Sequence, residues 1–313
     1  MNAQQVRESF ARCGYIADGD LCTAVELMLA LQKPLLVEGP AGVGKTESAK
    51  VLAGVLNAKL IRLQCYEGLD AANALYEWNY PKQLLHIRLT ENAGIPTAQR
   101  EAEIFSERFL LRRPLLEAIS QDSPAVLLID EIDRADEAFE AFLLEILGEF
   151  QVTIPEIGTI AAKTRPVVIV TSNRTRDLSD ALRRRCLYLW IEYPSLEREI
   201  EILRARVPGV NEGLARQIAT FMEFLRTQPF SRVPGTAESL DWALALVRLH
   251  REALDERTLE ETAGCILKVQ EDWELARTLR SAYAPLLNRG REGDGGEGPE
   301  ADYGLGSVRA NVR

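Results

Sequence analysis

The stretch "PLLVEGPAGVGKTESAKVL" constrains the fold more strongly than any other part of the chain. An apolar run ends at Glu38, the pattern GxxxxGK[ST] occupies residues 39–46, and a helical periodicity follows directly. The glycines of this pattern allow backbone N–H groups to close around phosphate oxygens, and the N-terminus of a helix adds partial positive charge. The order strand, glycine-rich loop, helix therefore predicts an α/β fold with a phosphate-binding P-loop.

The side chains of this loop have distinct expected partners. Lys45 would reach the β- and γ-phosphates of a nucleotide, and the hydroxyl group of Thr46 would bind Mg²⁺. A purely structural glycine-rich turn would leave Lys45 unexplained. The predicted nucleotide-binding residues of the loop are Gly39, Pro40, Ala41, Gly42, Val43, Gly44, Lys45, Thr46 and Glu47.

The order of the apolar runs predicts the rest of the fold. Short runs at "PLLVEG", "KLIRLQC", "AVLLID", "PVVIVTSN" and "LYLWIE" are mostly separated by helical periodicity. Near-continuous apolar strands between helices predict a parallel sheet covered by helices on both faces. After Pro194 the periodicity is helical, and from Arg289 onward glycine and acidic residues dominate. We therefore expect an α/β nucleotide-binding domain over residues 1–193, an all-helical lid domain over 194–288 and a disordered tail over 289–313.

Polar residues at two strand ends predict hydrolysis of the nucleotide. The run in "VLLIDEIDRADEAF" ends in Asp130, where a carboxylate can hold Mg²⁺ through water. Glu131 follows, where a carboxylate can polarise a water molecule for attack on the γ-phosphate. The run "PVVIVTSN" ends in Asn173, whose amide can hydrogen-bond the γ-phosphate or the attacking water. The segment "NRTRD" departs from the guanine-selective pattern N-K-x-D, so ATP with Mg²⁺ is the expected cofactor pair.

Composition excludes several other classes. The formal net charge of -10 argues against a partner that is nucleic acid or an anionic membrane, because both usually require a basic face. The 5 cysteines form no CxxC pair, and the 2 histidines do not suggest His-based catalysis or metal binding. No apolar signal core opens the chain, and no window reaches membrane-spanning length. We therefore expect a cytoplasmic protein without an integral membrane segment.

The order of P-loop, "DE", Asn and an arginine cluster resembles the AAA+ ATPases over roughly Leu35 to Pro194. In that family an arginine in the position of "ALRRRC" reaches the nucleotide of the neighbouring subunit and stabilises charge on the γ-phosphate. The resemblance implies that Arg185 has this role, with Arg184 as the alternative, and that the chain forms a ring. It also implies that Ile16, in "GYIAD", packs on the adenine; simple core packing is the competing interpretation.

Two longer sequence segments narrow the resemblance to one family within the AAA+ proteins. "LLIDEIDRADEAFEAFLLEILGEFQVTIPEIG" is similar to the MoxR family of AAA+ proteins, in which a β-hairpin, here "GEFQVTIPEIGTIAAKT", precedes the Asn-bearing strand. "LYEWNYPKQLL", within an insertion, looks most like the MoxR type that accompanies aerobic carbon monoxide dehydrogenase. The resemblance implies hexameric rings, a chaperone-like remodelling activity, a partner with a von Willebrand A domain and a metalloenzyme client.

One departure from that family concerns the lid. MoxR relatives often carry a nucleotide-sensing arginine in the third lid helix, but "VPGTAESLDWA" has Ser239 near that place and no arginine before Arg248. Arg232 is close in sequence and is expected in the preceding loop. Coupling of the lid to the nucleotide through an arginine is therefore not predicted by the sequence.

Two other classes remain open at this stage. A small-molecule P-loop kinase would share Lys45 and Asp130, and would usually work as a monomer or dimer with a mobile lid. A nucleic-acid-acting ring ATPase would share the ring, although the acidic charge disfavours it. Ring formation with ATP analogues and the response of ATP hydrolysis to DNA distinguish these classes from a protein-remodelling ATPase.

Overall fold

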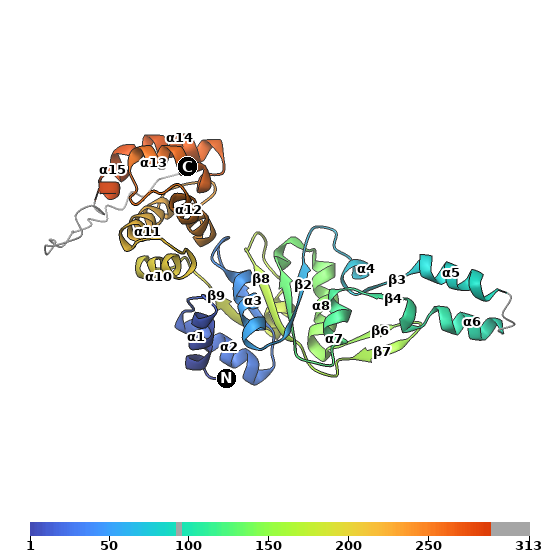
Figure 1. Ribbon diagram of the computed structural model, residues 1–313. Coiled ribbons are helices and arrows are strands. Elements are labelled where there is room, and N and C mark those ends of the chain that lie inside the picture. Colours follow the sequence, from blue (N-terminus) through green and yellow to red (C-terminus); the bar gives the residue numbers. More distant parts are fainter. Residues whose placement is uncertain (92–95, 289–313) are drawn as a thin grey trace, which may run out of the picture.

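The computed structural model describes residues 1–91 and 96–288, and the predicted tail over 289–313 lies outside the described residues. The molecule is elongated, with a central α/β region, a helical region at one end and a narrow arm at the other (Figure 1). The N-terminus lies beside the α/β region on the side of the helical region (Figure 1).

The centre of the α/β region is a parallel five-stranded sheet with the order β2-β5-β8-β1-β9. All of its strands coincide with the apolar runs of the sequence. They are β1 (Leu35–Glu38), β2 (Lys59–Gln64), β5 (Ala125–Asp130), β8 (Val167–Ser172) and β9 (Leu187–Trp190). Because the strands are parallel, the carboxyl ends of β1, β5 and β8 meet at one edge of the sheet, where ligands bind in folds of this kind.

Helices cover both faces of the sheet, as the sequence predicts. Alternation along β1 sends Leu36 into the apolar core shared with α7 and α8, and sends Leu35 and Val37 into the core shared with α1, α2 and α3. Burial on both faces explains why the strands lack a polar alternation. The covering helices are α1 (Ala3–Arg12), α2 (Gly19–Leu31), α3 (Lys45–Val55), α7 (Pro114–Ile119) and α8 (Glu137–Glu149).

The arm combines the insertion and the hairpin that the sequence analysis singled out. Trp78 is buried against Phe105, with ring centroids 5.4 Å apart, whereas Tyr80 is exposed. The hairpin is present, and Gly158 adopts a φ of 101° at its turn. The elements of the arm are α4 (Ala71–Ala74), β3 (Tyr76–Trp78), α5 (Tyr80–Thr90), α6 (Thr97–Ile104), β4 (Leu110–Arg112), β6 (Gln151–Ile154) and β7 (Gly158–Ala161).

Ser195 caps the first helix after Pro194, and from there to residue 288 the described chain is helical, with its own apolar core around Trp242 and Phe221. The last helical stretch is more broken than its periodicity predicted, because a 3-10 turn at Ala263–Cys265 and an extended Val269 interrupt it. The helices are α10 (Leu196–Arg206), α11 (Glu212–Arg226), α12 (Thr236–Arg248), α13 (Glu256–Thr262), α14 (Gln270–Thr278) and α15 (Arg280–Asn288). Among the described residues, no helix has both the length and the apolar character needed to cross a membrane.

Candidate functional site

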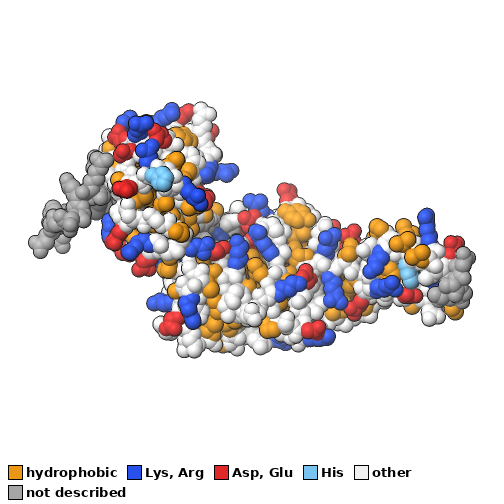
Figure 2. Space-filling model, viewed as in Figure 1, with side chains coloured by type: hydrophobic (Ala, Val, Ile, Leu, Met, Phe, Trp, Pro, Cys, Tyr) orange, Lys and Arg blue, Asp and Glu red, His pale blue; other side chains and the backbone are white. Residues whose placement is uncertain are grey.

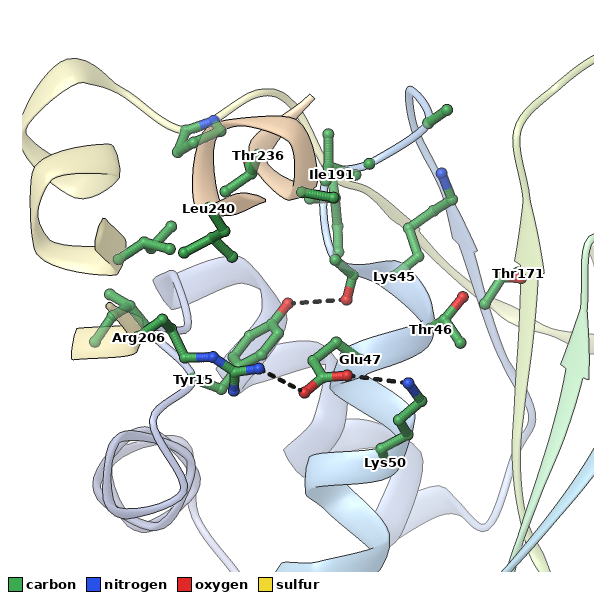
Figure 3. A pocket seen from close by; sticks show the side chains of 18 of the residues that line it. Tyr15, Lys45, Thr46, Glu47, Lys50, Thr171, Ile191, Arg206, Thr236 and Leu240 are labelled. Carbon is green, nitrogen blue, oxygen red and sulfur yellow. Dashed lines mark hydrogen bonds and ion pairs between the residues drawn. The ribbon is translucent and has the colours of Figure 1, made fainter. Parts of the chain in front are cut away.

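The P-loop lies at the carboxyl edge of the sheet, between β1 and α3, and lines a cavity of about 540 Å³. Gly42 and Gly44 have φ values of 77° and 93°, in the left-handed region that favours glycine, so the loop needs these residues for its shape. Residues from both sides of Pro194 line the cavity. Lys45 and Thr46 lie on one side of it, and Arg206, Thr236 and Leu240 lie across from them (Figure 3).

Lys45 is buried at the start of α3. Its Nζ donates to the carbonyl oxygens of Gly39 and Pro40, at 2.7 and 2.6 Å. Burial lowers the pKa of Lys45 to about 8, against the opposing effect of the nearby carboxylates, of which Asp133 is the strongest and Asp130 the next. The side chain is therefore mainly cationic at neutral pH and is held beside the space where a phosphate would lie.

Thr46 and Asp130 form a set of oxygen atoms that fits Mg²⁺. The Thr46 hydroxyl donates to Oδ1 of Asp130 at 2.9 Å, and the Thr171 hydroxyl donates to the same oxygen at 2.5 Å. The other carboxylate oxygen of Asp130 accepts from Arg62, at 3.0 Å from Nε. Hard divalent cations prefer hydroxyl and carboxylate oxygens, so these residues would hold the ion.

Glu131 lies at the same cavity in an unusual backbone conformation. Its φ is 56°, and its N–H donates to the Thr171 hydroxyl at 3.0 Å, which ties it to β8. Oε2 of Glu131 accepts from Gln64 at 3.1 Å and pairs with Arg134 at 2.9 Å. One oxygen of the carboxylate that the sequence predicts as the base is thus held by two neighbours.

Asn173 lines the cavity directly after β8, as the sequence predicts. Its backbone N–H donates to Asp133 at 3.1 Å, and Thr175 donates to the same carboxylate through its N–H at 2.9 Å and its hydroxyl at 2.7 Å. Although burial alone would raise the pKa of Asp133, these hydrogen bonds hold it below its usual range. Sequence reasoning missed Asp133, which orients the loop that carries Asn173. Its place in "DEID" could have indicated it.

The three arginines of "ALRRRC" have different surroundings at the end of α9 (Asp180–Arg185). Arg183 turns inward and lies 3.4 Å from the buried carboxylate of Glu38. Arg184 and Arg185 are exposed, and neither lines the cavity. The guanidinium group of Arg185 lies against Gly148 at the end of α8, 3.2 Å from where a Cβ would stand. Within the described residues, the structure does not bring Arg184 or Arg185 to the cavity of their own chain.

The far half of the cavity is largely apolar and includes Ile16, as the sequence suggested. Tyr15, beside it, donates its hydroxyl to the carbonyl oxygen of Gly44 at 3.4 Å (Figure 3), and burial raises its pKa. Glu47, expected to contact the nucleotide, lines the cavity and pairs with Lys50 at 3.2 Å and with Arg206 of α10 at 3.1 Å. Sequence reasoning missed Tyr15, although it lies in the segment "GYIAD" that was chosen for Ile16, and it missed Arg206, which no local pattern marked.

The start of α12 packs directly on the P-loop. The N–H of Ala237 donates to the carbonyl oxygen of Gly42 at 3.1 Å, and a Cβ on Gly235 would stand 2.7 Å from the carbonyl oxygen of Ala41. Ser239 points instead into the helical region, where its hydroxyl donates to Glu199 at 2.5 Å. Arg232, as expected, precedes α12, and it does not line the cavity. The arginines of the helical region that do line the cavity are Arg198 and Arg206 of α10.

Comparison with known proteins finds a matching family model, several relatives and similar solved structures. Residues 35–190 match the model of the ATPase family associated with various cellular activities (AAA). An uncharacterized protein of Staphylococcus epidermidis is 26% identical over 207 residues, which cover 64% of this chain and 71% of the relative. An uncharacterized protein of Staphylococcus haemolyticus is 24% identical over 218 residues, covering 67% and 75%. Among solved structures, the RuvB Holliday junction branch migration motor of Thermotoga maritima gives a TM-score of 0.44 at 17% identity, covering 90% of this chain and 76% of RuvB.

The region matched by the family model begins with β1 and ends with β9, so it contains the whole sheet. It also contains the P-loop and both acidic residues at the end of β5. Residues 35–190 therefore form an ATPase domain of the AAA family, with a P-loop AAA+ fold. The chain is an ATP-hydrolysing enzyme.

Proposed function

We propose that this chain is a Mg²⁺-dependent AAA+ ATPase of the MoxR type, which works as a ring and remodels another protein. The observation that supports the proposal is that the candidate catalytic side chains fall into two sets, one inside the cavity and one outside it. Lys45, Asp130 and Glu131 converge on one cavity, whereas Arg184 and Arg185 are exposed outside it. A chain built in this way can bind and polarise ATP itself and can offer its arginines to a neighbour.

In this proposal, residues 1–193 form the nucleotide-binding domain, and residues 194–288 form a lid. Lys45 compensates phosphate charge, and Thr46 with Asp130 holds Mg²⁺, which would neutralise negative charge on the phosphates. Further P-loop contacts come from residues 39–44 and Glu47, with Ile16 against the adenine.

Glu131 acts as the general base that takes the proton of the attacking water. Asn173 hydrogen-bonds the γ-phosphate or that water, and Asp133 keeps its loop in place through the hydrogen bonds described above. Gln64 and Arg134 hold Oε2 of the Glu131 carboxylate and so fix its position beside the cavity.

We infer a ring of subunits from the two exposed arginines of α9. Arg185 is assigned the role of stabilising γ-phosphate charge in the neighbouring subunit, and Arg184 is the alternative. A group that acts only across a subunit boundary couples hydrolysis to assembly, and the MoxR resemblance implies six subunits. Exposure of both side chains in the single chain supports this assignment.

The remodelling role is supported by the arm. Its helix α5 exposes Leu84, Leu85 and Leu89, with 61%, 59% and 74% of their surface accessible. Hydrophobic side chains reach the surface over the arm, whereas acidic and basic side chains are interspersed over much of the face shown in Figure 2. Exposed apolar side chains favour a protein as the substrate over a nucleic acid.

The subtype is the narrowest part of the proposal. The amino-acid sequence of residues 75–85 and the hairpin β6–β7 support a MoxR protein that assists a metalloenzyme such as aerobic carbon monoxide dehydrogenase. In this proposal the chain also has a partner with a von Willebrand A domain. An ATP hydrolysis rate that responds to such a partner and stays unchanged on addition of DNA is the expected result. A rate that rises with DNA would favour a nucleic-acid motor instead.

Glu131→Gln tests the central assignment. The amide cannot take a proton from water, so we expect unchanged ATP binding and a loss of hydrolysis of at least about a hundredfold. The variant should also accumulate as rings with ATP, measured by light scattering after gel filtration. Glu137→Gln, an exposed carboxylate at the start of α8, is the matched control and should hydrolyse ATP normally. Rapid hydrolysis by Glu131→Gln would move the base elsewhere.

A further inference from the structure

Glu38 is a fully buried carboxylate for which the proposed mechanism has no use. It is the last residue of β1, has 0% exposure, and directly precedes the P-loop. Its two oxygens accept from the hydroxyl of Tyr188 at 3.1 Å and from Nη2 of Arg183 at 3.4 Å. A charge in such a place is tolerated only with partners, and removing one partner of a buried pair is costly. Glu38 and Arg183 therefore constrain one another.

Glu38 also acts on the P-loop lysine. It is one of the carboxylates whose charge opposes the fall in the pKa of Lys45. The same carboxylate thus acts electrostatically on Lys45 and contacts the arginine-bearing helix α9. These two segments lie 145 residues apart in the sequence at the Glu38–Arg183 contact.

The position of α9 depends on such contacts. It has only 6 residues, too few for a helix that is stable by itself. Leu182 anchors it in the apolar core, and the N–H of Ser179 donates to the buried Glu140 at 2.8 Å. Arg183 is the charged anchor nearest to the exposed Arg184 and Arg185, so it limits the directions in which those side chains leave the molecule.

We propose that Glu38 is a positioning residue for the neighbouring active site. It holds Arg183 and thereby sets the direction of Arg184 and Arg185, which act in the next subunit. The inference rests on the proposed function, because it requires an arginine that works across a subunit boundary. It explains why only two of the three arginines are exposed: the first one fixes the helix that presents the others.

The test is Glu38→Gln in mixed rings. The neutral amide loses the charge that holds Arg183, so the variant should still bind ATP at neutral pH and lose hydrolysis by between about tenfold and a hundredfold, as expected for misplaced catalytic groups. Mixed with Lys45→Ala subunits, it should regain activity, because its intact P-loop can meet the correctly held arginines of the partner. Mixed with Arg185→Ala subunits, it should regain none, because neither chain then supplies a well-placed arginine.

Two further variants control for instability. Arg183→Gln breaks the same contact from a side chain that is 30% exposed, and it should reproduce the pattern of Glu38→Gln. Glu199→Gln removes an equally buried carboxylate from Arg226, 2.5 Å away in the helical region. Mixed with Arg185→Ala subunits, Glu199→Gln should restore ATP hydrolysis as wild-type subunits do, because its own arginines stay in place.

The possible outcomes distinguish a failure of the inference about Glu38 from a failure of the proposed function. If Glu38→Gln regains activity with Arg185→Ala and not with Lys45→Ala, its defect lies in its own P-loop and the inference about Glu38 is wrong. Full activity of Glu38→Gln alone also overturns the inference. If Lys45→Ala and Arg185→Ala regain no activity with each other, the proposed function fails first, and the inference about Glu38 falls with it.

Discussion

At the scale of single residues, the charge of Lys45 depends on its surroundings. Burial lowers its pKa from 10.5 to about 8, while the carboxylates around it oppose that fall. Phosphate oxygens stabilise the cationic form, so ATP must raise this pKa when it binds. Binding above pH 8 therefore includes the uptake of a proton.

ATP affinity should accordingly fall as the pH rises past about 8, by up to about tenfold per pH unit. The dissociation constant of a fluorescent ATP analogue, measured from pH 7 to 9.5, checks this. Lys45→Arg is the control, because a guanidinium group stays charged over this range and its affinity should not show the same slope. A flat profile in the wild-type protein would contradict a Lys45 that contacts phosphate and loses its charge over this range.

The stability of the protein should change in the opposite direction. Since the pKa of Lys45 is lower in the folded state than in the unfolded state, the unfolded chain binds more protons between pH 8 and 10.5. This contribution to the free energy of unfolding rises with pH over that window. A loss of ATP affinity there cannot be attributed to this group unfolding the protein.

At the scale of elements, the contact between α12 and the P-loop joins the helical region to the α/β region. Gly235 is the closest point, because its added Cβ would meet backbone atoms of Ala41 and Gly42 at 2.7 and 2.8 Å. Backbone atoms of the P-loop cannot yield without changing the shape of the loop. Position 235 therefore requires glycine for close approach, although its φ of −91° is ordinary.

Gly235→Ala should push α12 away from the P-loop and weaken ATP binding, at a cost of about 1–3 kcal/mol. Isothermal titration with ATP, alongside thermal unfolding, measures both effects. Gly54→Ala is the matched control, since a Cβ there meets no atom within 4 Å and a helix interior favours alanine. Equal ATP affinity in Gly235→Ala and the wild type would contradict a role for this contact in nucleotide binding.

At the scale of the whole molecule, the proposed active site is shared between two chains. One chain contributes the P-loop and the acidic residues at the end of β5, and α9 of the neighbouring chain contributes the arginine. Arg185→Ala should bind ATP as the wild type does, but hydrolyse it about a thousandfold more slowly, by analogy with other arginines that act in trans. Arg184→Ala should have the smaller effect. Rates of phosphate release for the two variants decide between them, and the reverse order would assign the role to Arg184.

Mixing variants tests whether the site is shared. Lys45→Ala and Arg185→Ala each damage a different half, so mixed rings contain interfaces with an intact P-loop and an intact arginine. Such mixtures should be more active than either variant alone. If neither arginine variant is impaired, the cluster is only a solvated helix end with one anchored member, Arg183.

Local patterns in the sequence determined the five strands, the P-loop and the acidic pair Asp130–Glu131. These features depend on neighbours within a few residues: apolar runs form buried strands, and glycines at fixed spacing form a phosphate-binding loop. Asn173 was located for the same reason, because the end of a parallel strand is visible in the sequence. The broken helices after Thr262 were not predicted, because a 3.6-residue periodicity continues through a short 3-10 turn.

Only the tertiary structure decided which residues from distant segments meet. Glu38 contacts Arg183 145 positions away, Glu47 contacts Arg206 159 positions away, and α12 lies on Gly42. None of these contacts leaves a periodic signal, because each depends on the way in which already formed elements pack. The sequence showed an arginine cluster at the border of the core, and packing divided it into one half-buried anchor and two exposed side chains.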